Sequence, residues 1–488
     1  MKKSFLLFVP ALLICVAAQA KITLPSVLSD NMVLQQQTEV SIWGKTDSGN
    51  TVKVCPGWTR TKYIVDPDAD GKWSVKVKTP AAGFTPYEIK ISDGDDITLK
   101  NVLIGEVWFC SGQSNMEMPM KGYPSQPTEG ATDFIIGAKT SRPLRICNIR
   151  KCSSTTVVEK TEGSWNEHTP EIVAGTSATA YFFADFLQKQ LDVPVGILIS
   201  SWGGSTIETW LDRETIEEKF PGEFDLFYLG QPWDKKYAKK DHQWPCLLYN
   251  GQIAPLVPFT FKGMIWYQGE SNRGREEQYI RLMQAYANMM RTKFQVPDAP
   301  YYFVQIAPYG YKSSHGDNSY ASGFMYEAQQ KAAEIIPHSG MAVTVDIGAR
   351  NTIHPFKKRE VGMRLAMLAL ANDYGVKGFN PNAPTFAGME VKDGAAFISF
   401  NNAELGLSPM AMQLDGFEIA GADKKFIPAQ AILSNPRNVV KVWSEEIPEP
   451  VAVRYCFRNW CVGSVFNNYG IPVAPFRTDN WSKEEVPN

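Results

Sequence analysis

The chain lacks an excess of charge of either sign. Its 488 residues carry 49 Lys and Arg against 51 Asp and Glu, a formal net charge of −2, and no long run of like charge interrupts this balance. Nucleic-acid-binding proteins usually present a basic stripe, so the composition argues against a nucleic-acid partner. Apolar residues make up 44% of the chain and charged residues 20%, which excludes a disordered chain. The sequence is that of a folded protein.

Long apolar runs are absent after residue 20. Before it, Lys2 and Lys3 precede an apolar run over 5–16 and the small-residue pattern of 18–20. The run is too short to span a bilayer, and its order is typical of a cleaved secretory signal. We expect residues 1–20 to be a signal peptide and the mature protein to be exported to the periplasm or outside the cell, without membrane attachment. A buried first helix is the alternative.

Cysteine is scarce, and its spacing argues against a zinc site. Seven cysteines follow the signal, with neither a CxxC pair nor interleaved histidines, and we expect no metal and no organic cofactor. An odd number leaves at least one free thiol. Two pairs with four intervening residues, Cys147/Cys152 and Cys456/Cys461, could close small loops, and buried free thiols are the alternative.

Hydrophobic periodicity divides the mature chain into three regions. Residues 21–100 alternate apolar and polar positions and predict an antiparallel β-domain. In 101–375, apolar runs alternate with segments of helical period, which predicts an α/β fold with a doubly wound, mostly parallel sheet. An aromatic-rich interval near 212–258 interrupts this alternation of strands and helices. It is either an insertion near the site or a plain loop. Period-two runs return in 376–488 as a C-terminal β-region. The predicted strands are 102–110, 144–149, 195–200, 263–267, 301–306 and 341–347, and the predicted helices are 178–191, 276–294, 324–336 and 357–374.

Ligands of open parallel sheets bind beyond the carboxyl ends of the strands, which directs attention to the segments that follow them. Ser114 stands where the first strand turns through Gly112, a position that exposes a hydroxyl as a nucleophile. Serine needs a base, and His354 follows the last predicted strand. Among the five histidines, His315 is the second candidate. A serine that caps a helix and a histidine that packs in a loop are the structural alternatives.

An oxyanion hole needs two or three hydrogen-bond donors directed at one oxygen. The backbone N–H groups of Ser114 and Gly204 and the side-chain amide of Gln268 all follow predicted strands. A tight turn at Gly204 and a buried, satisfied amide at Gln268 are the alternatives. Because all three groups follow strands of one predicted sheet, their joint placement favours an oxyanion hole.

Four motifs together resemble a known family: Gly112-Gln-Ser-Asn-Met116, Trp202-Gly-Gly-Ser205, Trp266-Tyr-Gln-Gly-Glu-Ser-Asn272 and Ile353-His-Pro355. They resemble the sialate O-acetylesterase family of SGNH hydrolases, and they are also similar to acetylxylan esterases. The resemblance implies an SGNH-type sheet with Ser114 as nucleophile and His354 as base. It implies an oxyanion hole formed by Ser114, Gly204 and Gln268, with Glu270 and Asn272 as supporting residues.

Two positions depart from the family pattern. Relatives commonly carry Asp three residues before the histidine, where this chain has Asn351. Either Asp346 or a backbone carbonyl then orients His354, or the enzyme uses a Ser-His dyad. Relatives also often carry Arg where Tyr326 precedes Glu-Ala-Gln, which bears on substrate specificity.

The resemblance therefore implies an exported serine esterase that removes O-acetyl groups from carbohydrate, with O-acetylated sialic acid as the first expectation. Acetylated xylan is the alternative substrate. A carbohydrate-binding protein with a decayed esterase site is a second hypothesis, favoured by Asn351 and Tyr326. A lipase or peptidase is a third, weakened by the lack of an apolar lid. The oligomeric state does not follow from the sequence.

Overall fold

The computed structural model describes residues 22–232, 238–311, 316–410 and 412–485, so the expected signal peptide and His315 lie outside the described residues. A mostly parallel sheet forms its centre, in the order β13-β12-β11-β7-β10-β8-β9. Every neighbouring pair along this order is parallel except β8 and the edge strand β9. The strands are β7 (Asp96–Gly112), β8 (Leu144–Asn148), β9 (Trp165–Glu167), β10 (Val195–Ser201), β11 (Gly263–Tyr267), β12 (Tyr301–Val304) and β13 (Ser339–Ala342).

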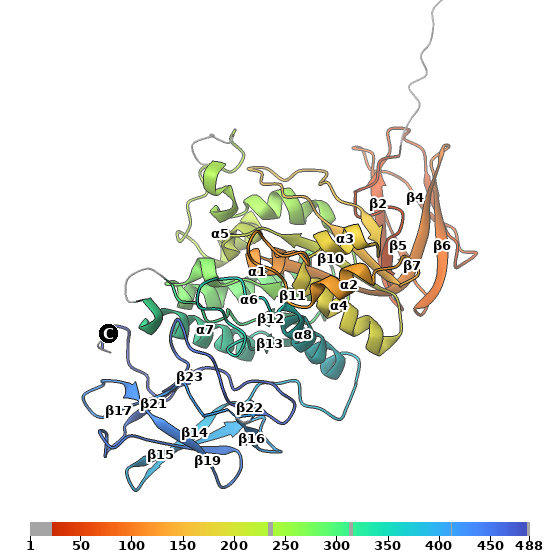
Figure 1. The fold of residues 1–488 in the computed structure, drawn as a ribbon. Helices are drawn as coiled ribbons and strands as arrows, with labels where there is room; N and C mark the ends of the chain where they lie inside the picture. Colours follow the sequence, from red (N-terminus) through yellow and green to blue (C-terminus); the bar gives the residue numbers. More distant parts are fainter. Residues whose placement is uncertain (1–21, 233–237, 312–315, 411, 486–488) are drawn as a thin grey trace, which may run out of the picture.

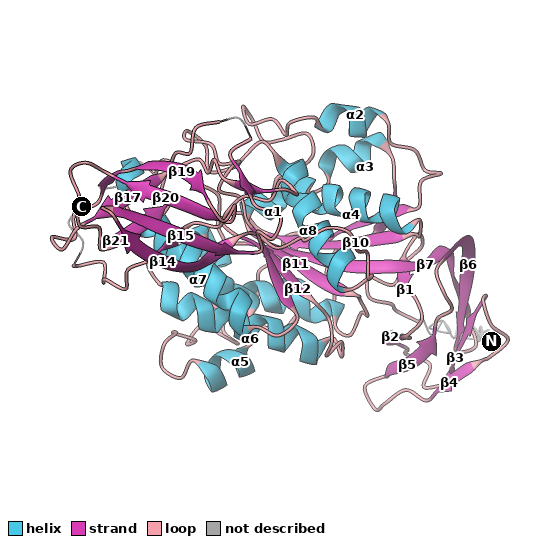
Figure 2. Cartoon of the chain, turned by 90° about the horizontal axis from the view of Figure 1, so that it is seen from below, coloured by secondary structure: helices cyan, strands magenta, loops and turns pink. Residues whose placement is uncertain are grey.

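Helices cover both faces of this sheet (Figure 2). On β7, Trp108 and Cys110 join the buried cluster that contains α4 and α8, whereas Phe109 joins the cluster that contains α6 and α7. The alternation follows from the two-residue period of a strand that is buried on both sides. The mixed α/β architecture predicted from the apolar runs is confirmed. The helices are α1 (Ser114–Glu117), α2 (Ala131–Ile136), α3 (Pro170–Gly175), α4 (Ala178–Leu191), α5 (Arg213–Lys219), α6 (Glu276–Lys293), α7 (Ala321–Ile335) and α8 (Lys358–Asn372).

Two β-regions lie at opposite ends of the central sheet (Figure 1). The N-terminal region joins it through β7, which pairs with β1 and β6 before it enters the centre, so the boundary expected at residue 100 falls within one strand. Its strands are β1 (Val33–Gln35), β2 (Glu39–Lys45), β3 (Val52–Pro56), β4 (Tyr63–Val65), β5 (Lys72–Lys78) and β6 (Gly83–Ser92). The C-terminal region has its own apolar core. Its strands are β14 (Thr385–Lys392), β15 (Ala395–Asn401), β16 (Leu407–Ser408), β17 (Phe417–Ala420), β18 (Ile427–Pro428), β19 (Gln430–Ser434), β20 (Val439–Trp443), β21 (Ala452–Tyr455), β22 (Phe466–Asn467) and β23 (Phe476–Arg477).

One strand differs clearly from its prediction. The run 341–347 reads as a strand, but β13 ends at Ala342. Val343 and Val345 are buried in the core of the C-terminal region, and the Ile347 N–H bonds the Thr344 carbonyl in a turn. A buried segment outside the sheet has the same run of apolar residues as a buried strand. Periodicity alone does not distinguish the two.

Candidate active site

Three of the four motifs meet at one edge of the central sheet. Strands β11, β7 and β10 are parallel neighbours, so the segments that follow their carboxyl ends lie side by side. These segments carry Ser114 after β7, Trp202–Ser205 after β10 and Gln268–Asn272 after β11. The placement expected for a ligand site in a parallel sheet is therefore present.

Ser114 begins α1 directly after the turn from β7. Gly112 in this turn has φ +144, and a Cβ there would lie 2.2 Å from the Tyr267 carbonyl oxygen, so only glycine fits. Ser114 is partly exposed, and its Oγ donates no hydrogen bond among the residues that the structure describes. The hydroxyl is accessible.

The loop after β10 packs against this serine. A Cβ on Gly203 would lie 3.2 Å from Ser114 Cβ, and Gly204 adopts the left-handed region with φ +78. Gly203 donates its N–H to Glu117 Oε2 at 2.5 Å. By contrast, the N–H groups of Ser114 and Gly204 donate to no other group within the described part of the chain. Two unpaired backbone donors beside one hydroxyl are what an oxyanion hole requires.

Gln268 does not present its amide to this site. Its Nε2 donates to the Ser205 carbonyl at 3.1 Å and to Asn272 Oδ1 at 2.7 Å, and the residue is fully buried. Both amide hydrogens are engaged, so the expectation that Gln268 contributes to the oxyanion hole is corrected. Its bonds instead connect the loops after β10 and β11.

Asn272 and Glu270 are both buried and hold this loop. Asn272 accepts a hydrogen bond from the Ile207 N–H at 3.0 Å and donates to Glu208 Oε2 at 2.9 Å. Glu270 Oε1 accepts from Asn115 Nδ2 at 2.6 Å. Burial raises the pKa of Glu270. Both residues therefore lie where supporting residues would.

Asn115 connects the serine to the histidine segment. Its Nδ2 also donates to the Ile353 carbonyl at 3.1 Å, and its Oδ1 accepts from Lys358 Nζ at 2.5 Å. Lys358 is fully buried, and that burial lowers the pKa of its ammonium group to about 7. The residue that follows Ser114 is thus bonded to the residue that precedes His354.

His354 lies between β13 and α8, and its Nδ1 is 2.7 Å from Gln126 Oε1. A carbonyl oxygen only accepts, so Nδ1 carries the hydrogen and the neutral ring keeps its lone pair on Nε2. Burial, together with the charge of Lys358, lowers the pKa of His354 to about 4. The imidazole is therefore neutral at pH 7, as a general base must be.

Tyr123 lies between the two candidates. Its hydroxyl donates to the Ser114 carbonyl at 3.3 Å, and its ring packs edge-on against His354 with 5.1 Å between centroids. The structure thus brings Ser114 and His354 to the same tyrosine.

Gln126 is the residue that the sequence did not reveal. It shares a tight turn with Tyr123, closed by two backbone hydrogen bonds of 2.9 and 3.0 Å between them. Its Oε1 also accepts from Thr352 Oγ1 at 2.8 Å. No motif surrounds it, and the contact spans 228 residues of sequence, so only the fold places it.

Among the described residues, neither Asp346 nor Asn351 forms a hydrogen bond with His354. Asp346 uses both carboxylate oxygens to pair with Arg364, at 2.7 and 2.8 Å. Asn351 is exposed and makes no hydrogen bond to His354 among the described residues. Of the three alternatives, orientation of His354 by Asp346 or by a backbone carbonyl is corrected, since Gln126 Oε1 occupies Nδ1. The Ser-His dyad stays a prediction.

Tyr326 lies inside the protein. It is fully buried in α7, and its hydroxyl has no hydrogen-bond partner among the described residues. Burial raises the pKa of this hydroxyl well above its ordinary value. A fully buried residue does not contact a substrate, so its effect on specificity would have to be indirect.

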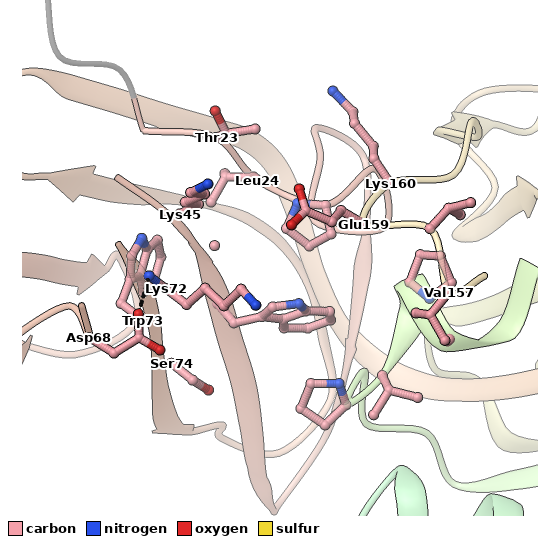
Figure 3. A pocket seen from close by; sticks show the side chains of 18 residues that line it. Thr23, Leu24, Lys45, Asp68, Lys72, Trp73, Ser74, Val157, Glu159 and Lys160 are labelled. Atoms are coloured by element: carbon pink, nitrogen blue, oxygen red, sulfur yellow. Dashed lines mark hydrogen bonds between the residues drawn. The ribbon is translucent and has the colours of Figure 1, made fainter. Parts of the chain in front are cut away.

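A cavity of about 670 Å³ lies between β2, β5 and the segments 157–160 and 254–258 (Figure 3). Its lining includes Trp43, Lys45, Lys72, Trp73 and Glu159, and none of the four motifs contributes to it. It is separate from the candidate active site.

Two further features are absent from the described ranges. These ranges contain no group of three or more His, Cys, Asp or Glu that could hold a metal ion. No described helix combines the length and apolar character needed to cross a membrane.

Known proteins similar to this chain indicate its family. The family model for carbohydrate esterases described as sialic acid-specific acetylesterases matches residues 104–370. The chain is 26% identical to the sialate O-acetylesterase of Mus musculus over 89% of each protein, and 27% identical to that of Homo sapiens over 74% of this chain and 72% of the relative. The crystal structure of a carbohydrate acetylesterase from Xanthomonas citri superposes with a TM-score of 0.82 at 33% identity, covering 94% of this chain and all of that one. The chain therefore belongs to the sialic acid-specific acetylesterase family of carbohydrate esterases and is a carboxylic ester hydrolase.

Proposed function

We propose that this protein removes O-acetyl groups from carbohydrate, foremost from O-acetylated sialic acid, through an acetyl-serine intermediate. One observation carries the proposal. The accessible Ser114 lies beside two backbone N–H groups that have no partner among the described residues, in a cluster with a histidine whose Nδ1 is held by Gln126. Nucleophile, base and oxyanion site are the three parts that acyl transfer needs.

The proposed reaction begins with attack of Ser114 Oγ on the acetyl carbonyl carbon. Nε2 of His354 takes the hydroxyl proton, and the N–H groups of Ser114 and Gly204 bond the developing oxyanion. Collapse of the tetrahedral intermediate breaks the ester bond, and His354 returns the proton to the sugar oxygen that leaves. Water, deprotonated by His354, then attacks the acetyl-serine. Acetate is released, and His354 returns the proton to Ser114 Oγ.

The test uses Ser114→Ala and His354→Ala with 4-nitrophenyl acetate as substrate. We expect kcat to fall about 10⁴-fold or more in each, because such residues act as a unit. Unchanged circular dichroism and melting temperature would show that both variants fold. A fully active Ser114→Ala variant would disprove the mechanism.

The competing function is a sugar-binding protein whose esterase site has decayed. It is favoured because, among the described residues, an amide and not a carboxylate bonds Nδ1 of His354. A fluorophosphonate probe distinguishes the two, because it labels only an activated serine. Labelling of Ser114 in the wild type and its loss in His354→Ala support the esterase.

A side-by-side comparison of two substrates determines which acetylated sugar the protein prefers. We expect higher kcat/KM with O-acetylated N-acetylneuraminic acid than with acetylated xylan, in keeping with the names of the mammalian relatives. The reverse order would make the protein an acetylxylan esterase.

We also propose that the protein is exported to the periplasm or beyond. The proposal is supported by the pattern of residues 1–20, in which two lysines precede an apolar run and small residues at 18–20 match a cleavage site. N-terminal sequencing of the mature protein should begin near Lys21. A mature chain that retains residues 1–20 would exclude cleavage.

A further inference from the structure

The expected insertion contributes a second histidine to the site. His242 belongs to η2 (Ala238–Gln243) and lies outside all four motifs. The position that a Cβ would take on Gly204 is 3.1 Å from His242 Nε2. Apart from the two chain neighbours of Gly204, no other described residue has an atom within 4 Å of that position. The imidazole therefore covers the loop that supplies the proposed oxyanion donor.

Hydrogen bonds hold η2 against this loop. Gln243 Nε2 donates to the Gly204 carbonyl at 3.0 Å, and Thr206 Oγ1 donates to the Gln243 carbonyl at 3.3 Å. Ser153 Oγ donates to Asp241 Oδ2 at 2.5 Å. These three hydrogen bonds hold Asp241 and Gln243, the neighbours of His242 in the chain, and so fix the position of its ring.

The ring itself has one nitrogen available. Its plane is 14° from that of Trp202, with 5.8 Å between centroids, and Nδ1 lies 3.5 Å from Asp241 Oδ1. Nε2 makes no hydrogen bond among the described residues. An imidazole nitrogen that is half-buried and unpaired at the edge of a site can hydrogen-bond a ligand.

We propose that His242 contacts the sugar of the bound ester through Nε2 and so helps to select the substrate. The inference rests on the proposed esterase function. A sugar offers many hydroxyl groups, and each can donate to or accept from imidazole. An aryl acetate offers none. Loss of Nε2 should therefore affect the sugar ester more than the aryl ester.

The experiment compares His242→Ala and His242→Phe with O-acetylated N-acetylneuraminic acid and 4-nitrophenyl acetate. Phenylalanine keeps a ring against Trp202 but has no nitrogen. We expect both variants to lose at least about tenfold more kcat/KM with the sugar ester than with the aryl ester, the effect of one hydrogen bond. His338→Ala is the control, because His338 is an exposed histidine paired with Asp373 at 2.8 Å.

Equal losses with the two esters, or no loss with the sugar ester, would overturn the role of His242. Failure of the esterase proposal would look different. In that case Ser114→Ala would hydrolyse 4-nitrophenyl acetate at the wild-type rate, whatever the His242 variants do.

A separate observation concerns two cysteines in the C-terminal region. The Sγ atoms of Cys456 and Cys461 lie 2.7 Å apart, and Gly416 leaves room for them, since a Cβ there would lie 2.7 and 2.9 Å from the two sulfurs. Asn459, between them, accepts hydrogen bonds from Ser322 Oγ at 2.8 Å and Arg273 Nη1 at 3.4 Å. Arg273 directly follows Asn272 of the motif after β11.

We infer that Cys456 and Cys461 are a site of disulfide formation that fixes this turn beneath the active-site loop. The two thiols lose two protons and two electrons, which reduce the disulfide of an oxidant such as oxidised glutathione to two thiols. The five other described cysteines are free thiols without such a neighbour within the described ranges.

Peptide mapping tests this pairing in the full-length protein after exposure to oxidised glutathione. The protein is denatured, alkylated with iodoacetamide and digested with trypsin, which cuts after Arg458 between the two cysteines. We expect peptides 455–458 and 459–477 to remain linked until a reductant is added, and to be separate in Cys461→Ser. Alkylation of both thiols in the oxidised wild type would overturn the inference.

Discussion

Gln126 Oε1 and His354 Nδ1 lie 2.7 Å apart, so a neutral amide occupies the nitrogen that a carboxylate orients in many serine hydrolases. The amide selects the tautomer with hydrogen on Nδ1 and leaves Nε2 free to take a proton. It does not supply a negative charge to stabilise the imidazolium that forms during the reaction. Gln126 therefore orients the imidazole without stabilising its charged form.

Gln126→Ala removes the acceptor of Nδ1, and Gln126→Glu replaces it with a charged acceptor. We expect the alanine variant to lose about tenfold in kcat, the effect of one neutral hydrogen bond. In the glutamate variant, the carboxylate favours the imidazolium and raises the pKa of His354. The acidic limb of kcat/KM should then move to higher pH. Gln430→Ala on β19 is the control, because Gln430 is exposed. A full rate in Gln126→Ala would contradict the assignment.

The wild-type pH profile should extend far into the acidic range. Burial and the Lys358 charge lower the pKa of His354 to about 4, so Nε2 stays unprotonated from pH 7 down to about pH 5. We expect kcat/KM for 4-nitrophenyl acetate to be nearly constant over that range and to fall as the pH drops through about 4. An acidic limb near 6.5, the ordinary value for histidine, would show that the ring is less buried in solution.

Asn351→Asp introduces the acid that the family resemblance implies at this position. Because Asn351 is exposed and Gln126 already occupies Nδ1 of His354, the new carboxylate should change kcat by less than about twofold. The measurement is kcat with 4-nitrophenyl acetate across pH 4–8. A tenfold rise, with the acidic limb moved to higher pH, would mean that residue 351 reaches the histidine.

The sequence predicted the central sheet well because buried strands and their helices have strong periodic patterns. Ser114 and His354 were also proposed as nucleophile and base from motifs that follow strands, and the structure places both against Tyr123. Their catalytic roles stay a prediction. Gln126 was missed because its role depends on a turn that contacts His354 from 228 residues away. The misassignment of Gln268 has a related cause: sequence does not show that Ser205 and Asn272 already accept both of its hydrogens.

Gly204→Ala tests the proposed oxyanion donor. The left-handed φ of +78 costs alanine about 1 kcal/mol. The new Cβ would lie 3.1 Å from His242 Nε2, so the His242 ring or the loop must move by a few tenths of an ångström. We expect kcat to fall about 100-fold, as when one oxyanion donor is displaced. Gly222→Ala is a matched control, since Gly222 has φ +75 and, apart from its chain neighbours, no described residue has an atom within 4 Å of the added methyl. Equal activity of the two variants would argue against Gly204 as a donor.

Lys358→Met removes the buried cation that links Asn115 to the base. Without this charge the pKa of His354 should rise above about 4, so the acidic limb of kcat/KM moves to higher pH. The buried Glu270 loses its neighbouring cation, and we expect the free energy of unfolding to fall by about 3 kcal/mol, with a lower melting temperature. Lys357→Met is the control, because Lys357 is the exposed neighbour in the chain and should change neither quantity. A lower melting temperature with an unmoved acidic limb would mean that Lys358 stabilises the loop without acting on His354.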